Sequence, residues 1–503
     1  MKVKYRIKLR KARVEETSSS KRDRICRKIL ECGILGLIIF SPLPAASVYD
    51  WSILVIELTV LVMFASYVLM KRRPTHNELL SESLKWPKHL FTGFFIFLLI
   101  QIIPWTKFIV RALSPGAYSF RKMYAADFSR VKLLNFSLVP SQTFREGLEL
   151  LTYFLLGFLI IKTVTHLDQI MRIFTVLFIM GVFEAFYGLF ELYRKNPRIL
   201  FYKKVYALDS VTGTFVNRNH FSGYMEMIIP LAIGLIIART EIFSTAGLKW
   251  RERLLRLSEK GLSTNLILFA GVVIMSLAVV LSKSRSGVFL LILTFLLFFE
   301  FSALYFGRIR HQQRWVRNFI IVTFLVITFI SLYVGVEATI GRFALDNLLK
   351  EGRPLYWRNI TSIVSDFPLF GTGLGTFASI YPAYESYERI TNPGRLTHAH
   401  NDYLEYLAEL GVVGTGLLLG GILFMAFNAF MMWRLRRHPL VKGLTLGGIV
   451  AVIAMLVHSI TDFNLHIPAN MLLFTVVLSM IVVTAFYRRG EGNKHRSGVS
   501  GRK

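Results

Sequence analysis

Cysteine and acidic residues are scarce in this chain of 503 residues. Its two cysteines, Cys26 and Cys32, are too few for a disulfide framework or a cysteine-based zinc site. Aspartate and glutamate number 31 against 60 lysines and arginines, which gives a formal net charge of +29. Charged residues make up only 18% of the chain and apolar residues 53%, so disordered and collagen-like classes are excluded as well.

The chain contains long, nearly unbroken apolar runs, whereas the sequence of a soluble protein alternates apolar and polar residues. Runs of about 18 or more apolar residues are typical of transmembrane helices, and we expect about twelve of them. The predicted fold class is therefore an all-α polytopic membrane protein. A Ser-Pro-Leu-Pro sequence interrupts the first run, which we interpret as a retained helix rather than a cleaved signal peptide. The expected spans are 29–48, 51–70, 88–105, 146–163, 168–192, 219–238, 264–282, 287–306, 318–336, 411–433, 443–462 and 467–487.

The distribution of lysine and arginine orients these spans. Most of these residues lie in the tails and in short segments that alternate along the chain, so the positive-inside rule predicts that both termini are cytoplasmic. The basic residues flank the spans and form no nucleic-acid-binding motif, so we expect membrane lipid and not nucleic acid as their partner. The predicted divisions are transmembrane helices within 29–336 and 411–487, a large outer loop at 337–410, and basic tails at 1–28 and 488–503.

Polar residues gather at the end of the large outer loop, in the sequence THAHNDYLE at 397–405. A metal site is one interpretation, but His398 and His400 are two positions apart and no HExxH motif occurs, so no metal is expected. A second interpretation is a general base, because a neutral histidine can take a proton from a hydroxyl near neutral pH. A third is structural, with Asn401 or Asp402 capping the helix that follows.

Arginines next to the predicted spans form a second group of candidates. Arg218 lies in GTFVNRNH at 213–220, and Arg285 lies in SKSRSG at 282–287, between two apolar segments. Charges so close to hydrocarbon are costly and indicate function, although snorkelling to lipid phosphate is an alternative. Because the guanidinium fork matches phosphate oxygens, we expect a lipid diphosphate on the outer face. The candidate substrate-binding residues are Arg353, Arg358, Asn217, Asn219, Asn401, Asp402 and Trp357.

An ordered set of motifs resembles a known family. From about residue 211 to residue 474, the chain resembles the O-antigen ligase and O-antigen polymerase superfamily of bacterial envelope glycosyltransferases. The spacing from His400 to the glycine pair Gly411 and Gly414 is similar to the ligase signature. The motifs are GTFVNRNHFSGY at 213–224, SKSRSG at 282–287, GRPLYW at 352–357, FPLFGTGLGTF at 367–377, HAHNDYLEYLAELGVVG at 398–414 and DFNLHIPAN at 462–470.

This resemblance implies a GT-C-like helical membrane fold and glycan transfer without a metal or other cofactor. The implied donor is a glycan on undecaprenyl diphosphate, used at the periplasmic face of the bacterial inner membrane. The implied acceptor is lipid A–core for a ligase, or another carrier-linked glycan for a polymerase. His400 would be the catalytic base, oriented by Asp402 or Glu405. Arg218 and Arg285 would bind the diphosphate and stabilise its departure, with inversion at the anomeric carbon.

Other interpretations of the same residues stay open. Within the class, the chain could be an O-antigen or exopolysaccharide polymerase, or an oligosaccharyltransferase that modifies protein. A different class is a transporter of an anionic lipid-linked glycan, since a cationic cavity and about twelve spans also occur there. The sequence shows no inverted repeat, and charged residues are scarce inside the spans, so we favour the ligase-type enzyme.

Overall fold

The computed structural model describes residues 21–71, 78–125, 127–239, 260–306, 353–385 and 396–487, with a few positions between 318 and 329. Most of the predicted span 318–336 lies outside these residues, as do positions 337–352 of the large loop. Both extreme tails, at 1–20 and 488–503, lie outside them too.

Long helices account for most of the described chain. Every predicted span except 318–336 overlaps one of them. Within the described residues, seven helices are long and apolar enough to cross a membrane: α3, α9, α10, the 264–281 part of α12, α20, α21 and α22. This confirms the prediction of an all-α polytopic membrane protein. The long helices are α2 (Lys21–Phe40), α3 (Asp50–Leu69), α5 (Lys85–Ile102), α8 (Pro140–Thr163), α9 (Leu167–Leu192), α10 (Arg218–Arg239), α12 (Lys260–Leu281), α13 (Arg285–Phe306), α20 (Asp402–Arg434), α21 (Pro439–His458) and α22 (Pro468–Phe486).

The first helix differs from its predicted bounds at both ends. The chain is already helical at Lys21, the first described residue, within the segment predicted to be a tail, and the helix ends at Phe40 instead of continuing to position 48. The chain turns there because a proline ring cannot continue a helix, and prolines follow at 42 and 44. A short 3₁₀ helix, η1 (Ala45–Ser47), then leads into α3.

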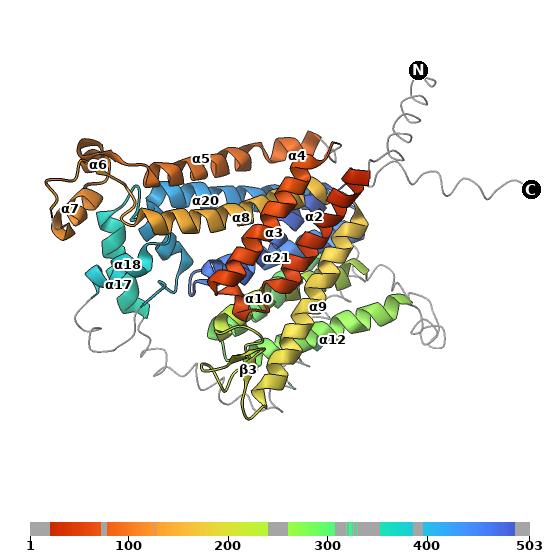
Figure 1. The fold of residues 1–503 in the computed structure, drawn as a ribbon. Helices are drawn as coiled ribbons and strands as arrows, with labels where there is room; N and C mark the ends of the chain where they lie inside the picture. The colour runs from red at the N-terminus through yellow and green to blue at the C-terminus, as the bar shows by residue number, and fades with distance from the viewer. Residues whose placement is uncertain are drawn as a thin grey trace, which may run out of the picture.

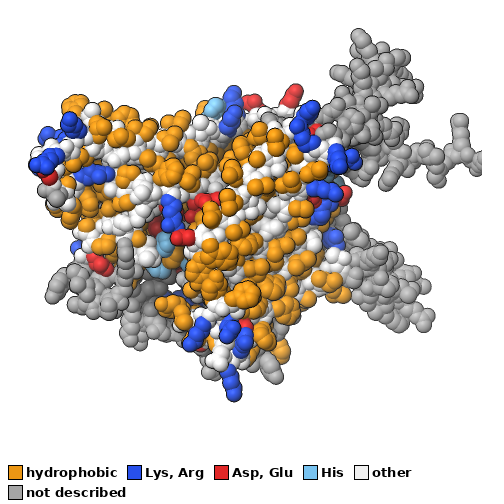
Figure 2. All heavy atoms as spheres, in the orientation of Figure 1, with side chains coloured by type: hydrophobic (Ala, Val, Ile, Leu, Met, Phe, Trp, Pro, Cys, Tyr) orange, Lys and Arg blue, Asp and Glu red, His pale blue; other side chains and the backbone are white. Residues whose placement is uncertain are grey.

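Two helices lie inside the bundle. The apolar window of α10 is completely buried and that of α22 is 94% buried, whereas only 33% of the α3 window is buried. Close approach between α10 and α21 depends on small residues, because a Cβ on Gly234 would collide with the backbone of Gly443. The outer helices expose leucines and valines, and Figure 2 shows hydrophobic side chains along their flanks with lysines and arginines near the ends.

Short elements pack together at one end of the bundle, which we call the loop end; the opposite end, where α2 begins, is the N-terminal end (Figure 1). The segment 106–145 and the described part 353–385 of the predicted large outer loop share one apolar core there, around Val110, Phe136 and Ile360. The elements are β1 (Trp105–Thr106), α6 (Lys107–Leu113), α7 (Pro115–Tyr124), β2 (Leu133–Leu134), α17 (Arg353–Asp366), α18 (Phe377–Ile380) and η3 (Tyr381–Tyr384). Three further short elements are α4 (Glu78–Ser83), β3 (Arg198–Ile199) and β4 (Tyr202–Lys203). Strand β1 pairs with β2, and β3 with β4, each antiparallel.

Helix α20 is broken at Gly411, where the predicted span begins. Gly411 has φ 60°, and the Val412 N–H donates to the Pro368 carbonyl at 2.8 Å. The loop that contains Gly371 and Gly373, both with positive φ, packs against this break. The glycine run at 371–375 can turn tightly here, because glycine adopts these angles without strain.

A glycine substitution at the break should cost stability. We expect Gly411→Ala to destabilise the protein by about 1–3 kcal/mol, because it adds both positive-φ strain and a clash with the Leu369 backbone. Gly416→Ala is a matched control in the same helix, where an added Cβ meets nothing within 4 Å. It should stabilise the helix by up to about 1 kcal/mol. Thermal unfolding in detergent measures both, and a lower melting temperature for Gly416→Ala would contradict this account.

Candidate functional site

The N-terminus of α20 docks on the turn between α21 and α22. The Asn401 side chain caps the helix by accepting from the Leu404 N–H at 3.0 Å. The Asp402 N–H donates to the carbonyls of Ser459 at 2.9 Å and Asp462 at 3.2 Å. The structural interpretation of Asn401 as a helix cap therefore holds. The same contacts place His400, which directly precedes the cap, against the 459–466 turn.

Asp462 is the carboxylate that contacts His400. Its Oδ1 lies 3.2 Å from His400 Nδ1 and accepts from the Phe463 N–H at 2.9 Å. Its Oδ2 accepts from Asn219 Nδ2 at 2.5 Å, and His220 Nε2 lies 3.8 Å from Oδ1. Burial would raise the pKa of Asp462, but its contacts with the rings of His220 and His400 hold it well below its usual range. A buried, ionised carboxylate thus faces one nitrogen of the His400 ring.

His400 is itself placed for chemistry. Its side chain is 29% exposed, and within the described residues Nε2 has no hydrogen-bond partner. Its backbone φ is 50°, a left-handed conformation that is uncommon for residues other than glycine. Such backbone strain occurs disproportionately at functional sites. With Nδ1 held by Asp462, the neutral imidazole can accept a proton at Nε2.

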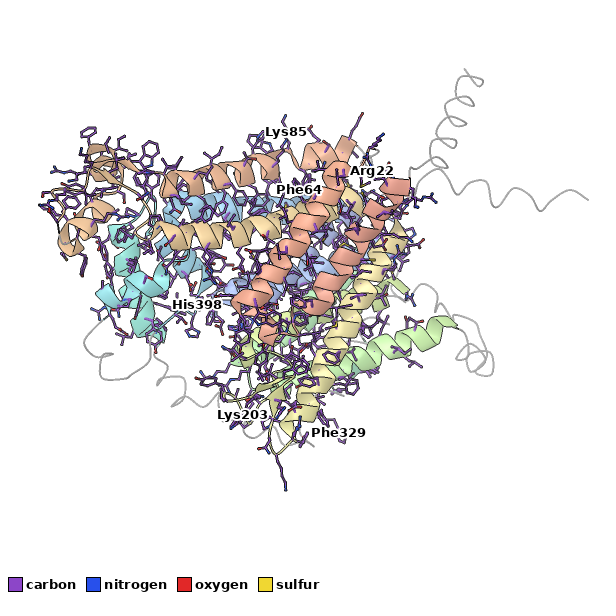
Figure 3. The ribbon with its side chains drawn as sticks, viewed as in Figure 1. Arg22, Phe64, Lys85, Lys203, Phe329 and His398 are labelled. Carbon is purple, nitrogen blue, oxygen red and sulfur yellow. The ribbon has the colours of Figure 1, made fainter. Side chains whose placement is uncertain are left out.

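Asp402 and Glu405, expected to orient His400, contact other histidines instead. Asp402 Oδ1 lies 2.6 Å from His466 Nδ1, and Glu405 Oε1 lies 2.8 Å from His398 Nδ1. Burial would lower the pKa of His466, but the carboxylates of Glu405 and Asp402 raise it to about 10. Asp402 is 1% exposed and so is shielded from a ligand. These pairs fix the 459–466 turn and the ring of His398. That ring stacks on the ring of Phe463, with 4.2 Å between the ring centroids (Figure 3 labels His398).

The two candidate arginines converge on the same turn from two other helices. Arg218 and Arg285 are the first residues of α10 and α13. Their neighbours in sequence connect both helices to the turn: Asn219 donates to Asp462, and the Ser286 hydroxyl lies 2.9 Å from that of Thr461. The two guanidinium groups repel each other electrostatically. Two helix N-termini, each with an arginine as its first residue, therefore adjoin the turn that carries Asp462, an arrangement that favours an anion.

A buried lysine that was not predicted from the sequence lies beside Arg218. Lys204 is 4% exposed, and its Nζ donates to the Ser210 carbonyl at 2.7 Å. Arg218 reaches the hydroxyl of the same serine at 3.5 Å. Burial lowers the pKa of Lys204 to about 8, although Asp209 opposes this. Nothing in the sequence distinguishes Lys204 from the exposed Lys203, so only the folded chain reveals its place.

Lys283 and Asp209 complete the charged cluster next to Arg218 and Arg285. Lys283 Nζ lies 2.7 Å from Asp209 Oδ2, and Lys283 has a positive φ of 57°. The Lys283 ammonium lowers the pKa of Asp209, so this carboxylate stays ionised. The carboxylate of Asp209 thus partly offsets the positive charge of Lys204, Arg218 and Lys283 at the loop end.

The other predicted residues have more varied positions. Trp357 Nε1 donates to the Ala399 carbonyl at 3.2 Å, so α17 supports the backbone just before His400. Asn217 accepts from the Asn219 N–H at 2.9 Å and shapes the start of α10. Arg358 is exposed on α17, and the side chain of Arg353, the first residue of α17, lies outside the described residues. In the part of the chain that the structure describes, no group of three histidine, cysteine or acidic side chains is arranged to hold a metal ion.

Comparison with known protein families agrees with the motifs. Residues 270–419 match the family described as O-antigen ligase. The matched region contains Arg285 and His400, while Arg218 and Asp462 lie outside it. No curated protein sequence matches the chain. The match confirms the resemblance to the O-antigen ligase superfamily and supports a membrane glycosyltransferase of ligase or polymerase type, whose partners are a lipid-linked glycan and an acceptor.

Proposed function

We propose that this protein is an O-antigen ligase-type glycosyltransferase of the bacterial inner membrane. It would move a glycan from undecaprenyl diphosphate to a hydroxyl of lipid A–core at the periplasmic face. The observation that carries the proposal is the convergence of three segments: His400 paired with Asp462 at 3.2 Å, and Arg218 and Arg285 at two helix N-termini linked to the same turn.

In this proposal His400 is the general base. Nε2 takes the proton from the acceptor hydroxyl as its oxygen attacks the anomeric carbon of the donor sugar. The bond between that carbon and the diphosphate oxygen breaks, so the configuration inverts and the electron pair leaves with undecaprenyl diphosphate. The buried carboxylate of Asp462 stabilises the imidazolium that forms and fixes the ring orientation, as its contact with Nδ1 supports.

Arg218 and Arg285 would act on the leaving group. Negative charge on the diphosphate grows as the glycosidic bond breaks, so fixed cations stabilise the transition state more than the bound substrate. The N-termini of α10 and α13 add partial positive charge at the same place. Lys204 and Lys283 would contribute further positive charge. This arrangement needs no metal to balance the developing charge.

A transfer assay with defined acceptors tests this function. The full-length protein in nanodiscs would receive undecaprenyl diphosphate-linked oligosaccharide, a chelator, and either lipid A–core, a second carrier-linked glycan or an acceptor protein. We expect glycan on lipid A–core, with release of undecaprenyl diphosphate in equal amount. Transfer to the carrier-linked glycan alone would instead establish a polymerase, and transfer to protein alone an oligosaccharyltransferase. No transfer to any acceptor, together with movement of the carrier across vesicle membranes, would overturn the proposal in favour of a transporter.

A further inference from the structure

A cavity of about 290 Å³ lies at the N-terminal end of the bundle, between α2 and the start of α9. Both helices run from this cavity toward the candidate site. Beyond the far end of α2, the Pro42 carbonyl accepts from the Thr214 hydroxyl at 2.7 Å, and Glu184 near the far end of α9 accepts from the same hydroxyl at 2.8 Å. Thr214 lies in the loop that leads to Arg218. The cavity and the candidate site are therefore at opposite ends of these helices.

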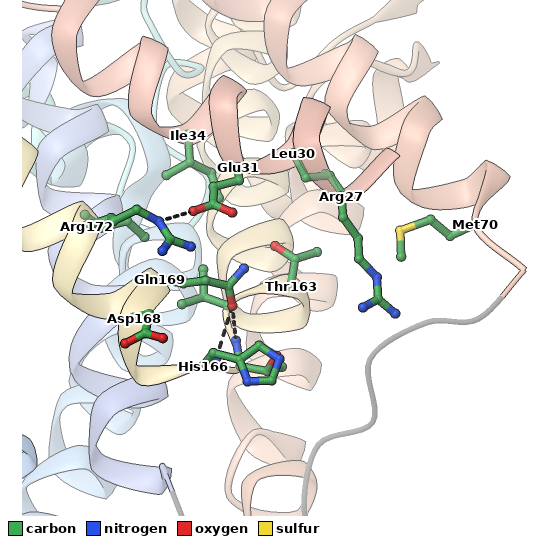
Figure 4. Close-up of a pocket in the computed structure, with 13 residues that line it drawn as sticks. Arg27, Leu30, Glu31, Ile34, Met70, Thr163, His166, Asp168, Gln169 and Arg172 are labelled. Atoms are coloured by element: carbon green, nitrogen blue, oxygen red, sulfur yellow. Dashed lines mark hydrogen bonds and ion pairs between the residues drawn. The ribbon is translucent and has the colours of Figure 1, made fainter. Parts of the chain in front are cut away.

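Charges of both signs line this cavity. Arg172 of α9 forms an ion pair with Glu31 of α2, so these two charges balance each other (Figure 4). Arg27 of α2 and Asp168 of α9 also line the cavity, and neither has an ion-pair partner among the described residues. Figure 4 shows Arg27 and Asp168 on opposite sides in that view. Among the described residues, Arg27 and Asp168 are thus the cation and the anion of this lining that a ligand can pair with.

The rest of the lining is part apolar and part polar. Leu30, Ile34 and Ile173 contribute hydrocarbon, while Thr163 contributes a hydroxyl. The volume is at the lower end of the range of about 300–1,000 Å³ typical of small-molecule sites, and it is far larger than one water molecule requires. A compact polar group attached to hydrocarbon fits this mixture better than a purely polar or a purely apolar molecule does.

We propose that this cavity binds the headgroup of a zwitterionic aminophospholipid, with its phosphate at Arg27 and its ammonium group at Asp168. A headgroup with only negative charge would leave Asp168 facing like charge, which is unfavourable. A quaternary ammonium has no N–H to donate to Asp168 and should bind more weakly than a primary ammonium. Arg27 offers phosphate the forked donors that a lysine lacks.

The consequence of binding is mechanical coupling. A headgroup held by Arg27 and Asp168 connects α2 to α9 at the end remote from His400. A ligand that binds only the folded state stabilises it by mass action, so the bound lipid should raise the melting temperature. This inference is independent of the proposed transfer reaction, because neither Arg27 nor Asp168 contacts His400, Asp462 or the cations near Arg218 and Arg285 in the described residues.

Lipid retention by the full-length protein in detergent tests the inference. Micelles would be doped with phosphatidylethanolamine, phosphatidylcholine or phosphatidylglycerol, and bound lipid would be counted by native mass spectrometry. We expect phosphatidylethanolamine to be retained most strongly.

Arg27→Gln should lower its retention about tenfold, the equivalent of one lost charge-assisted hydrogen bond. Asp168→Asn should abolish the preference over phosphatidylglycerol without abolishing binding. Arg24→Gln, exposed on the same helix and outside the cavity, is the matched control and should match the wild-type protein.

Two further arms separate binding in the cavity from general membrane affinity. Water-soluble glycerophosphoethanolamine should compete with the lipid if the headgroup is recognised, and should have no effect if only the acyl chains bind. Melting temperatures in lipid-free detergent verify that the variants fold. Equal retention of phosphatidylethanolamine by wild type and Arg27→Gln would overturn the proposal. A wild-type preference for phosphatidylglycerol would overturn the assignment of a zwitterionic ligand.

Discussion

Replacement of His400 by alanine should lower the rate of glycan transfer by about 10²- to 10⁴-fold, the range expected for loss of a general base. Donor binding should persist, because the cations of the loop end are separate residues. The physical reason is that His400 Nδ1 is held by the buried Asp462 carboxylate, so Nε2 remains for the acceptor hydroxyl. Single-turnover transfer and donor affinity should be measured on the same nanodisc preparation, so that chemistry and binding are separated.

The contact between His400 and Asp462 makes a companion variant informative. Asp462→Asn keeps the shape of the side chain but removes the charge that stabilises an imidazolium, so the rate should fall while donor affinity stays within about twofold. The pH profile of the rate should also shift in this variant, an effect that loss of folding alone would not produce. His89→Ala, on an exposed position of α5, is the control. Wild-type turnover in His400→Ala would exclude the proposed base.

Replacement of Arg285 by glutamine should lower the rate of transfer by about 10²- to 10³-fold, comparable to the loss of one fixed transition-state donor. Arg218→Gln should have a similar effect. Because both residues act on one diphosphate and repel each other when it is absent, the double variant should lose less than the product of the single losses. If donor affinity fell while the rate at saturation stayed unchanged, the arginines would bind the ground state only.

Neighbouring lysines provide a matched test of the positive cluster. Lys204→Gln should weaken competition by inorganic diphosphate about tenfold, because it removes a buried cation beside Arg218. Lys203→Gln removes an equal charge from the exposed end of β4 and should leave competition unchanged (Lys203 is labelled in Figure 3). Equal effects of the two substitutions would indicate a general electrostatic attraction and no specific place for Lys204.

Local sequence determined the elements of this fold. Transmembrane helices follow from apolar runs, and a run of about 18 residues has few alternatives in a membrane because its backbone must satisfy its own hydrogen bonds. The break at Gly411 and the turns at Gly371 and Gly373 follow from glycine's access to positive φ. His400, Arg218 and Arg285 were singled out for two other reasons: polar and charged residues next to apolar spans indicate function, and each lies in a motif that resembles one family.

Tertiary packing decided how the site is assembled. The sequence favoured Asp402 or Glu405 as the partner of His400 because they are near in the chain. Once Asn401 caps α20, however, the carboxylate of Asp402 points to His466 and that of Glu405 to His398. Asp462 reaches His400 from another turn, and this contact depends on how α20 docks against α21 and α22.

The local sequence does not predict the burial of Lys204 either. Lys203 beside it has the same side chain but is exposed, whereas Lys204 is buried. Likewise, the segments at 106–145 and 353–385 are far apart in the sequence, but they share one core because their apolar side chains pack together. Sequence thus determined the long apolar helices and the motif residues, because both depend on local composition and spacing. Only the structure decided which carboxylate contacts which histidine and which lysine lies beside the arginines. Those contacts form only after distant helices have packed.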